Sequence, residues 1–115
     1  MISTTSSEFL NWLNGCQSII NSYYKTNYAN ISSPVLKFDE GSKCIRVFLE
    51  SGGTRSCYCF VAKVNYETKE LGQVKEGDIL KSASWKKPAK HARGNLFDKD
   101  NGLQWMNSYG ATYLR

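Results

Sequence analysis

Two apolar segments joined by a pair of glycines dominate the middle of this 115-residue chain. Residues 43–50 carry aliphatic side chains at every second position from Ile45, the alternation typical of a β-strand, whose successive side chains point to opposite faces. Ser51-Gly52-Gly53-Thr54 supplies the residues that a tight reversal needs. Residues 56–64 return as a second arm that is apolar on both faces, which favours a central strand. The sequence therefore predicts an antiparallel hairpin within a larger sheet.

The N-terminal part of the chain carries the pattern of an amphipathic helix. Residues 5–8, Thr-Ser-Ser-Glu, match a capping box, in which a hydroxyl and a glutamate each bind a free backbone N–H at the start of a helix. We expect the helix to reach about Tyr24, with Gly15 allowing close contact with a neighbouring element. Apolar side chains recur at spacings of three and four, which places them on one face that we assign to the core: Phe9, Trp12, Leu13, Cys16, Ile19, Ile20 and Tyr23.

Shorter signals complete the predicted fold. Residues 35–38 form a strand candidate followed by a turn at 39–41, and residues 77–81 form another after a polar stretch. Pro88 and Gly94 bracket a predicted helix of one or two turns, because proline suits the first helical position and glycine the position past the end. The expected fold is α+β: an N-terminal amphipathic helix packed on a three- to four-stranded antiparallel sheet, with an irregular C-terminal region containing a short helix.

The C-terminal residues are expected to pack against this body, and no linker divides the chain. We therefore expect residues 1–115 to form a single domain. The apolar side chains that we expect to pin the C-terminal region are Phe97, Leu103, Trp105, Met106, Tyr109, Tyr113 and Leu114.

Composition places the chain among ordered globular proteins. Hydrophobic residues make up 41% and charged residues 22% of the sequence. No apolar run approaches the roughly 18 residues that cross a bilayer, and the first residues lack the charged and apolar regions of a secretory signal. We therefore expect no membrane partner and a cytosolic setting, in which the four cysteines stay reduced.

Patterns that resemble catalytic or metal sites are incomplete. Cys57 and Cys59 are two residues apart, whereas structural zinc sites use a C-x₂₋₄-C turn with a second pair of ligands. Residues 98–102 resemble the opening of a calcium loop but lack the glycine and glutamate that must follow. Ser84 has no nucleophile elbow around it, and no glycine-rich phosphate loop is present. We expect neither an enzyme, nor a metal site, nor a cofactor.

The formal net charge of +5 is confined to residues 81–93, which hold five basic side chains and no acid. The rest of the chain holds 10 basic and 10 acidic residues. Such a segment focuses a positive potential that attracts polyanions, and Trp85 within it offers a flat face for a nucleobase. The competing interpretation is a solvated loop with Trp85 in the core. The candidate nucleic-acid-binding residues are Lys81, Trp85, Lys86, Lys87, Lys90, His91 and Arg93.

Residues 77–98, GDILKSASWKKPAKHARGNLFD, form a distinctive segment that is followed by NGL and the final YGATYLR. These segments resemble small uncharacterised proteins of tailed bacteriophages. SSP at 32–34 and SCYCFVAK extend the resemblance over roughly residues 23–115. The resemblance implies a setting in the cytoplasm of an infected bacterium but supplies no activity. Lys87 departs from the pattern, which has a small apolar residue there.

Three functions are compatible with these features. The first is a non-enzymatic phage accessory protein that binds nucleic acid, DNA or RNA, through residues 81–93. The second is a module that binds or inhibits a host or phage protein through the same segment or an aromatic patch near Trp105 and Tyr109. The third is a minor virion component. The sequence leaves the oligomeric state open.

Overall fold

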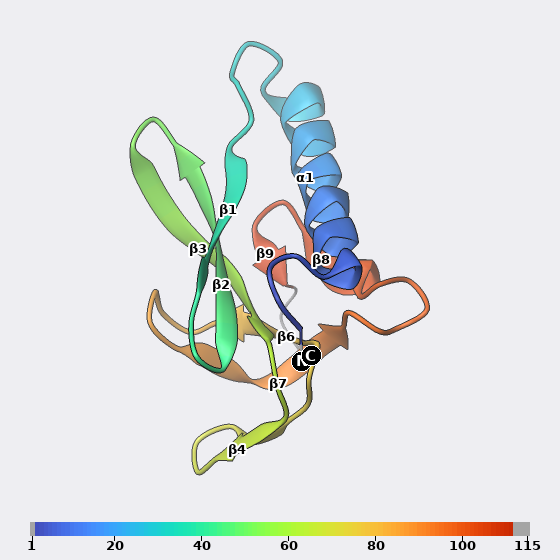
Figure 1. Cartoon of the computed structure of the whole chain (residues 1–115). Helices are drawn as coiled ribbons and strands as arrows, with labels where there is room; N and C mark the ends of the chain where they lie inside the picture. The colour runs from blue at the N-terminus through green and yellow to red at the C-terminus, as the bar shows by residue number, and fades with distance from the viewer. Residues whose placement is uncertain (1, 112–115) are drawn as a thin grey trace.

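The computed structural model describes residues 2–111, except for the side chain of Trp105. One long helix packs against a five-stranded sheet in which every pairing is antiparallel, with the strand order β1-β2-β3-β6-β7 (Figure 1). The α+β prediction is confirmed, although the sheet has more strands than the three or four expected. The elements of this body are α1 (Ser7–Asn27), β1 (Val35–Glu40), β2 (Cys44–Ser51), β3 (Thr54–Ala62), β6 (Asp78–Ser82) and β7 (Pro88–Asn95).

The predicted central hairpin is confirmed. β2 pairs with β3 as far as Ser51 and Thr54, and Gly52 and Gly53 between them adopt φ values of 57° and 83°. This left-handed conformation is one that glycine adopts without steric cost. β3 also pairs with β6, so it lies inside the sheet, as its two apolar faces predict.

The predicted helix is present and most of its apolar face packs in the core, but Tyr23 lies outside the core cluster and Tyr24 packs there instead. Phe9, Trp12, Cys16 and Ile20 are inaccessible to solvent, and α1 continues past Tyr24 to Asn27. The prediction of a capping box is wrong: the N-cap residue is Ser6, and its side chain makes no capping hydrogen bond to the helix. Its Oγ instead accepts the N–H of Ser3, while the Glu8 carboxylate accepts the Ser7 hydroxyl. Tertiary packing therefore stabilises the helix start more than local capping does.

The predicted short helix after Pro88 is wrong, because these residues form the edge strand β7. Ala92 pairs with Leu80 and Asn95 with Asp78, with register shifts between the pairs. A proline is compatible with an edge strand, whose outward N–H groups need no partner strand. His91 has a φ of 73°, which interrupts the regular strand. A helix here would have placed Lys90 and Arg93, three residues apart, on the same side, and the strand removes that arrangement.

Other boundaries differ from the prediction. β1 extends through Glu40, so the expected turn begins only at Gly41. The polar stretch after β3 contains a small hairpin of β4 (Tyr66–Thr68) and β5 (Gly72–Val74). Three residues per strand are too few to give a clear alternating pattern.

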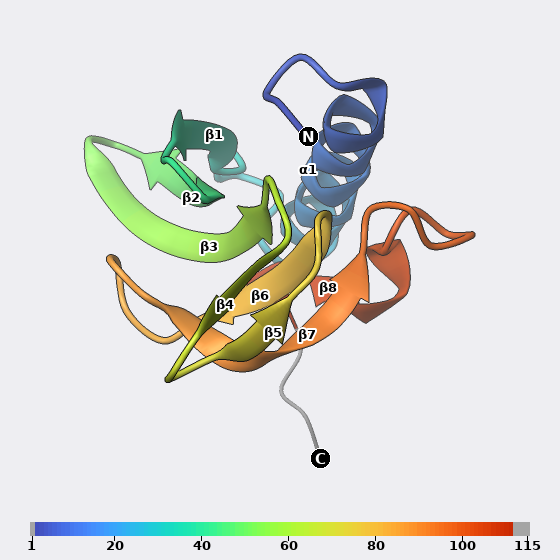
Figure 2. The same ribbon diagram turned by 60° about the horizontal axis from the view of Figure 1, so that its bottom comes forward.

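The sheet has an apolar cluster on each face. Val61 and Ile79 belong to the main cluster with α1, whereas their neighbours Phe60 and Leu80 belong to a smaller one on the opposite face. The β4–β5 hairpin covers the smaller cluster, with Val74 buried against it (Figure 2). We call the face under this hairpin the outer face, because α1 covers the other.

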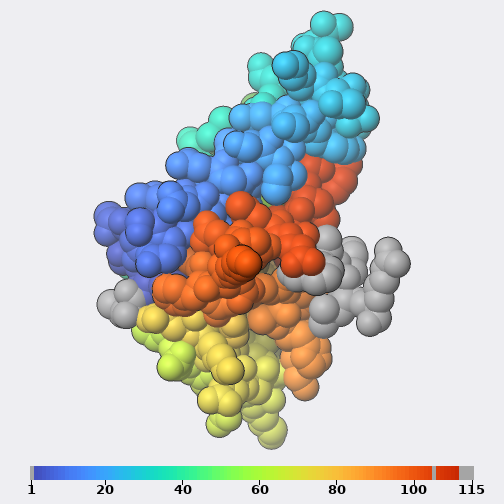
Figure 3. All heavy atoms as spheres, turned by 90° about the vertical axis from the view of Figure 1, so that its right-hand side faces the viewer, coloured from blue at the N-terminus to red at the C-terminus, as the bar shows by residue number. Residues whose placement is uncertain are grey.

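The C-terminal segment lies against α1 (Figure 3). It contains a 3₁₀ turn, η1 (Leu103–Trp105), and a two-stranded ribbon of β8 (Met106–Asn107) and β9 (Gly110–Ala111). Met106 is buried and Leu103 packs on the core, as predicted. Phe97 is exposed, and Tyr109 is largely exposed although its ring contacts Tyr23 on α1. Three side chains predicted to do so lie outside the described residues: Trp105, Tyr113 and Leu114.

Gly15 makes the close contact that its position predicts. A Cβ there would lie 2.6 Å from Cδ1 of Leu103 in η1. Within residues 2–111, no helix is long and apolar enough to cross a bilayer.

Candidate functional site

Residues 81–93, which we call the basic segment, span the end of β6, a turn at residues 83–87 and most of β7. We call residues 83–87 the basic loop. Its backbone is closed by N–H groups of Ala83 and Ser84, which donate to the Lys87 carbonyl at 3.0 and 3.1 Å. The Ser84 hydroxyl accepts the N–H groups of Lys86 and Lys87 at 3.3 and 3.2 Å. These bonds fix the loop and leave the side chains of Lys86 and Lys87 exposed.

Three of the seven candidate residues are directed away from the basic loop. Lys81 Nζ donates to the Ala111 carbonyl at 2.9 Å, on the sheet face that α1 covers. The Arg93 guanidinium donates to the carbonyls of Lys90 and His91, and partial burial lowers its pKa. The exposed His91 lines a separate hollow with Gln73. Among the lysines and the arginine of residues 81–93, Lys86, Lys87 and Lys90 are exposed, on the loop and β7.

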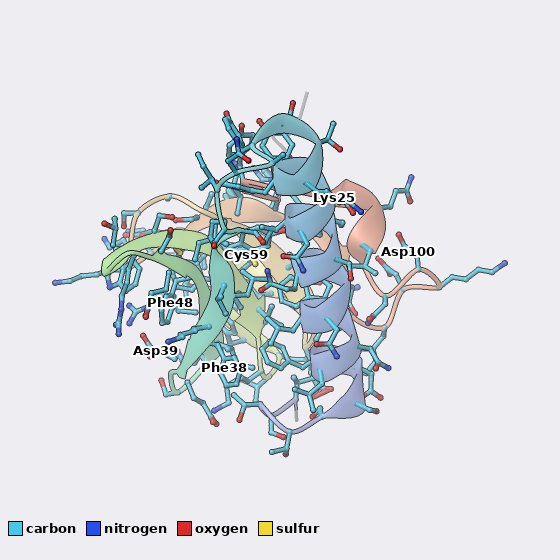
Figure 4. The ribbon with its side chains drawn as sticks, turned by 90° about the horizontal axis from the view of Figure 1, so that it is seen from above. Lys25, Phe38, Asp39, Phe48, Cys59 and Asp100 are labelled. Atoms are coloured by element: carbon cyan, nitrogen blue, oxygen red, sulfur yellow. The ribbon has the colours of Figure 1, made fainter. Side chains whose placement is uncertain are left out.

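Trp85 anchors the basic loop to the outer face of the sheet. Its ring lies 5.5 Å from the ring of Phe48, and the Arg46 guanidinium lies 4.3 Å from its centroid. Arg46 also donates to the Trp85 carbonyl at 3.3 Å and to Asp39 at 2.7 Å. Figure 4 shows Asp39 and Phe48 on the side of the sheet away from α1, with Phe38 and Cys59 facing it. Trp85 is half-buried, so much of its ring is in contact with the protein itself.

A groove runs beside the basic loop on the outer face. It encloses about 390 Å³ between the β1–β2 turn, the β4–β5 hairpin and the loop. We call it the hairpin groove. A second hollow adjoins it, because Thr68, Leu71 and Pro88 line both. Residues of the hairpin groove that bear on binding are Lys43, Arg46, Phe60, Tyr66, Leu71 and Lys86.

The fold adds two lysines that the sequence did not associate with the basic segment. Lys43 lines the hairpin groove, with its ammonium 5.4 Å from the ring centroid of Tyr66, and Lys69 lines the adjoining hollow with Lys87. Both come from the part of the chain whose charges balance, so counting charges along the sequence gave no signal for them. The groove and the adjoining hollow are together bordered by cations from three separate segments.

The acids at the groove are already paired. Asp39 binds Arg46, and Glu40 accepts a hydrogen bond from the nearly buried Lys63 at 2.7 Å. This bond to Lys63 holds the pKa of Glu40 below its usual value. Within residues 2–111, no carboxylate lies in ion-pair distance of Lys43, Lys69, Lys86, Lys87 or Lys90. The field of these five ammonium groups is therefore not cancelled by direct contacts.

The cysteines are free thiols in the structure. Burial raises the pKa of Cys16 to about 12, and burial also raises the pKa values of Cys44, Cys57 and Cys59. Such thiols are poor nucleophiles at neutral pH. No group of three or more His, Cys, Asp or Glu side chains suited to a metal is found within residues 2–111.

A second exposed surface lies at the C-terminal end of α1. Tyr109 is 70% exposed, and its ring contacts that of Tyr23 at 5.6 Å between centroids. Tyr28 packs on Tyr23 and Tyr24 at 6.0 and 5.3 Å. We call these four residues the tyrosine cluster. It is the described part of the aromatic patch expected near Trp105 and Tyr109.

Comparison with known proteins identifies a family without assigning an activity. No curated protein and no solved structure matches the chain. A family model described as a family of unknown function, DUF7717, matches residues 4–112, which include the whole sheet, the basic loop and the hairpin groove. The chain therefore belongs to the DUF7717 family.

Proposed function

We propose that this protein is a non-enzymatic accessory protein of a phage that binds nucleic acid at the basic loop. One observation carries the proposal: on the outer face, four lysines that make no ion pair within residues 2–111 line the hairpin groove and the hollow beside it. Lys86 and Lys87 come from the basic loop, Lys43 and Lys69 join them through the fold, and the exposed Lys90 follows on β7. Phosphates bound by such lysines release counterions, which supplies sequence-independent affinity.

The basic loop is also ordered before any ligand arrives. The Ser84 bonds and the contact of Trp85 with Arg46 and Phe48 hold it against the sheet. A preformed loop loses less conformational entropy on binding than a flexible one. Trp85 therefore supports binding by positioning the lysines, a different role from the base stacking considered from the sequence.

Salt dependence tests this proposal. We expect a mixed-sequence oligonucleotide of about 20 nucleotides to bind at roughly 50 mM salt and to be released as salt rises to roughly 200 mM. With four or five phosphate contacts on a single strand, the logarithm of the association constant falls against the logarithm of salt with a slope of about −3. Fluorescence anisotropy measures both quantities. If no binding is seen at the lower salt concentration, or if the affinity does not change with salt concentration, the proposed binding of phosphates by these lysines is excluded.

The tyrosine cluster favours a second candidate, a module that binds or inhibits a host or phage protein. Exposed tyrosines are enriched at protein interfaces because they bury a large area at low entropic cost. A stoichiometric protein recovered from nuclease-treated lysate by the wild type, and lost with Tyr109→Ser, supports this candidate. Co-purification with virus particles would instead indicate a minor virion component.

A further inference from the structure

The hairpin groove has the size and lining of a site for unpaired nucleotides. Its volume of about 390 Å³ falls in the range of small-ligand sites. Bases in a duplex are stacked inside it, so only an unpaired base can enter a groove and contact an aromatic side chain at its wall. The groove offers such a side chain in Tyr66, which is half-buried.

Tyr66 is held in a fixed position at the groove. Its hydroxyl lies 3.1 Å from Sγ of Cys44 on β2, which ties the β4–β5 hairpin to the sheet. Leu71 beside it and Phe60 below it extend the apolar surface. An aromatic ring with aliphatic neighbours is a surface on which any of the bases can pack, since every base has a π-face.

Cations flank this apolar surface on both sides. Lys43 stands at the β1–β2 turn, Lys86 stands on the basic loop, and both line the hairpin groove. Lys69 and Lys87 continue the series in the adjoining hollow, which Glu70 also lines. Aromatic side chains beside a track of lysines are the combination by which proteins hold single strands without sequence preference.

We infer that the hairpin groove binds single-stranded nucleic acid, with a base against Tyr66 and the neighbouring phosphates on Lys43 and Lys86. This inference rests on the proposed function and narrows its ligand to unpaired strands. The adjoining hollow receives the next part of the backbone, beside Lys69 and Lys87.

The first test compares a single strand of about 20 nucleotides with its duplex for the wild type and two Tyr66 variants. The wild type prefers the single strand by about tenfold. Tyr66→Leu loses about tenfold in single-strand affinity, as expected for one stacked base, while Tyr66→Phe, which keeps the ring, loses little. Duplex affinity is the same for all three proteins. Thermal unfolding confirms that each variant is folded.

A second pair of variants does not depend on the packing of Tyr66. Lys43→Gln makes the salt slope shallower by about 0.7 for the single strand. Lys99→Gln removes an equally exposed charge from the turn before η1 and leaves the slope unchanged. These measurements also keep the test informative if Tyr66→Leu fails to fold.

Two results overturn the inference while the proposed function stands. One is salt-dependent binding that is equal for strand and duplex and unaffected by Tyr66→Leu and Lys43→Gln. The other is displacement of the single strand by a free mononucleotide at a similar concentration, which would make the groove a site for a small ligand. If neither strand nor duplex binds at low salt, the proposed function itself fails.

Discussion

Replacing Lys86, Lys87 and Lys90 together by glutamine lowers the affinity for single-stranded nucleic acid by about 100-fold at roughly 0.1 M salt. Each lost phosphate contact removes about 0.7 from the salt slope, so the slope becomes shallower by about 2. All three side chains are exposed and lack an acidic partner within residues 2–111, so the fold is expected to remain intact. Anisotropy titrations at several salt concentrations measure affinity and slope together.

A matched control distinguishes the effect of the lysines' position on affinity from the effect of the protein's net charge. Lys25, Lys75 and Lys99 are equally exposed and lie on α1, the β5–β6 connection and the turn before η1. Changing these three to glutamine alters the net charge by the same amount but removes no lysine from the groove. We expect affinity within about threefold of the wild type, since distant charges are screened at this salt. Equal losses in both triple variants would show that net charge, and not the basic loop, governs binding.

Gly110→Ala destabilises the protein by at least about 3 kcal/mol. Gly110 has a φ of 128°, and a Cβ there would lie 2.2 Å from the carbonyl oxygen of Tyr58 in the central strand β3. That oxygen belongs to backbone in the middle of the sheet, so it cannot move aside. The clash would also pull the β8–β9 ribbon from β3, where the Tyr58 hydroxyl donates to the Asn107 carbonyl at 2.6 Å. Urea unfolding followed by fluorescence measures the change.

Gly53→Ala is the comparison for this effect. Gly53 also has a positive φ, 83°, but a Cβ there meets nothing within 4 Å. We expect a loss of about 1 kcal/mol from backbone strain alone. If the two variants lose the same free energy of unfolding, the close approach of Gly110 to Tyr58 contributes nothing.

The parts of the fold that the sequence predicted are those encoded by local patterns. The spacing of Phe9, Trp12 and Cys16 defines a helical face, and Gly52-Gly53 between two apolar arms defines a hairpin. β7 could not be found in this way, because its pairing with β6 decides its conformation and its local signals, Pro88 and Gly94, also fit a short helix. Tertiary pairing overrode the local preference there.

For the candidate site, too, the sequence predicted what depends on local pattern and missed what depends on the fold. The excess of basic residues in the sequence identified residues 81–93. It could not show that the Lys81 ammonium donates to the Ala111 carbonyl or that the Arg93 guanidinium donates to the nearby Lys90 carbonyl. Nor could it find Lys43 and Lys69, because both lie far from the basic segment in sequence and reach the groove only through the fold. Position in three dimensions, rather than the local surplus of charge, defines the surface that we propose to bind nucleic acid.

Amide chemical-shift mapping with a short single strand tests that surface most directly. We expect the largest changes at residues 84–90 other than Pro88 and at Lys43, Tyr66 and Lys69, with little change along α1. Largest changes on the tyrosine cluster, or changes spread over exposed lysines without regard to the hairpin groove, would show that nucleic acid does not bind at this surface.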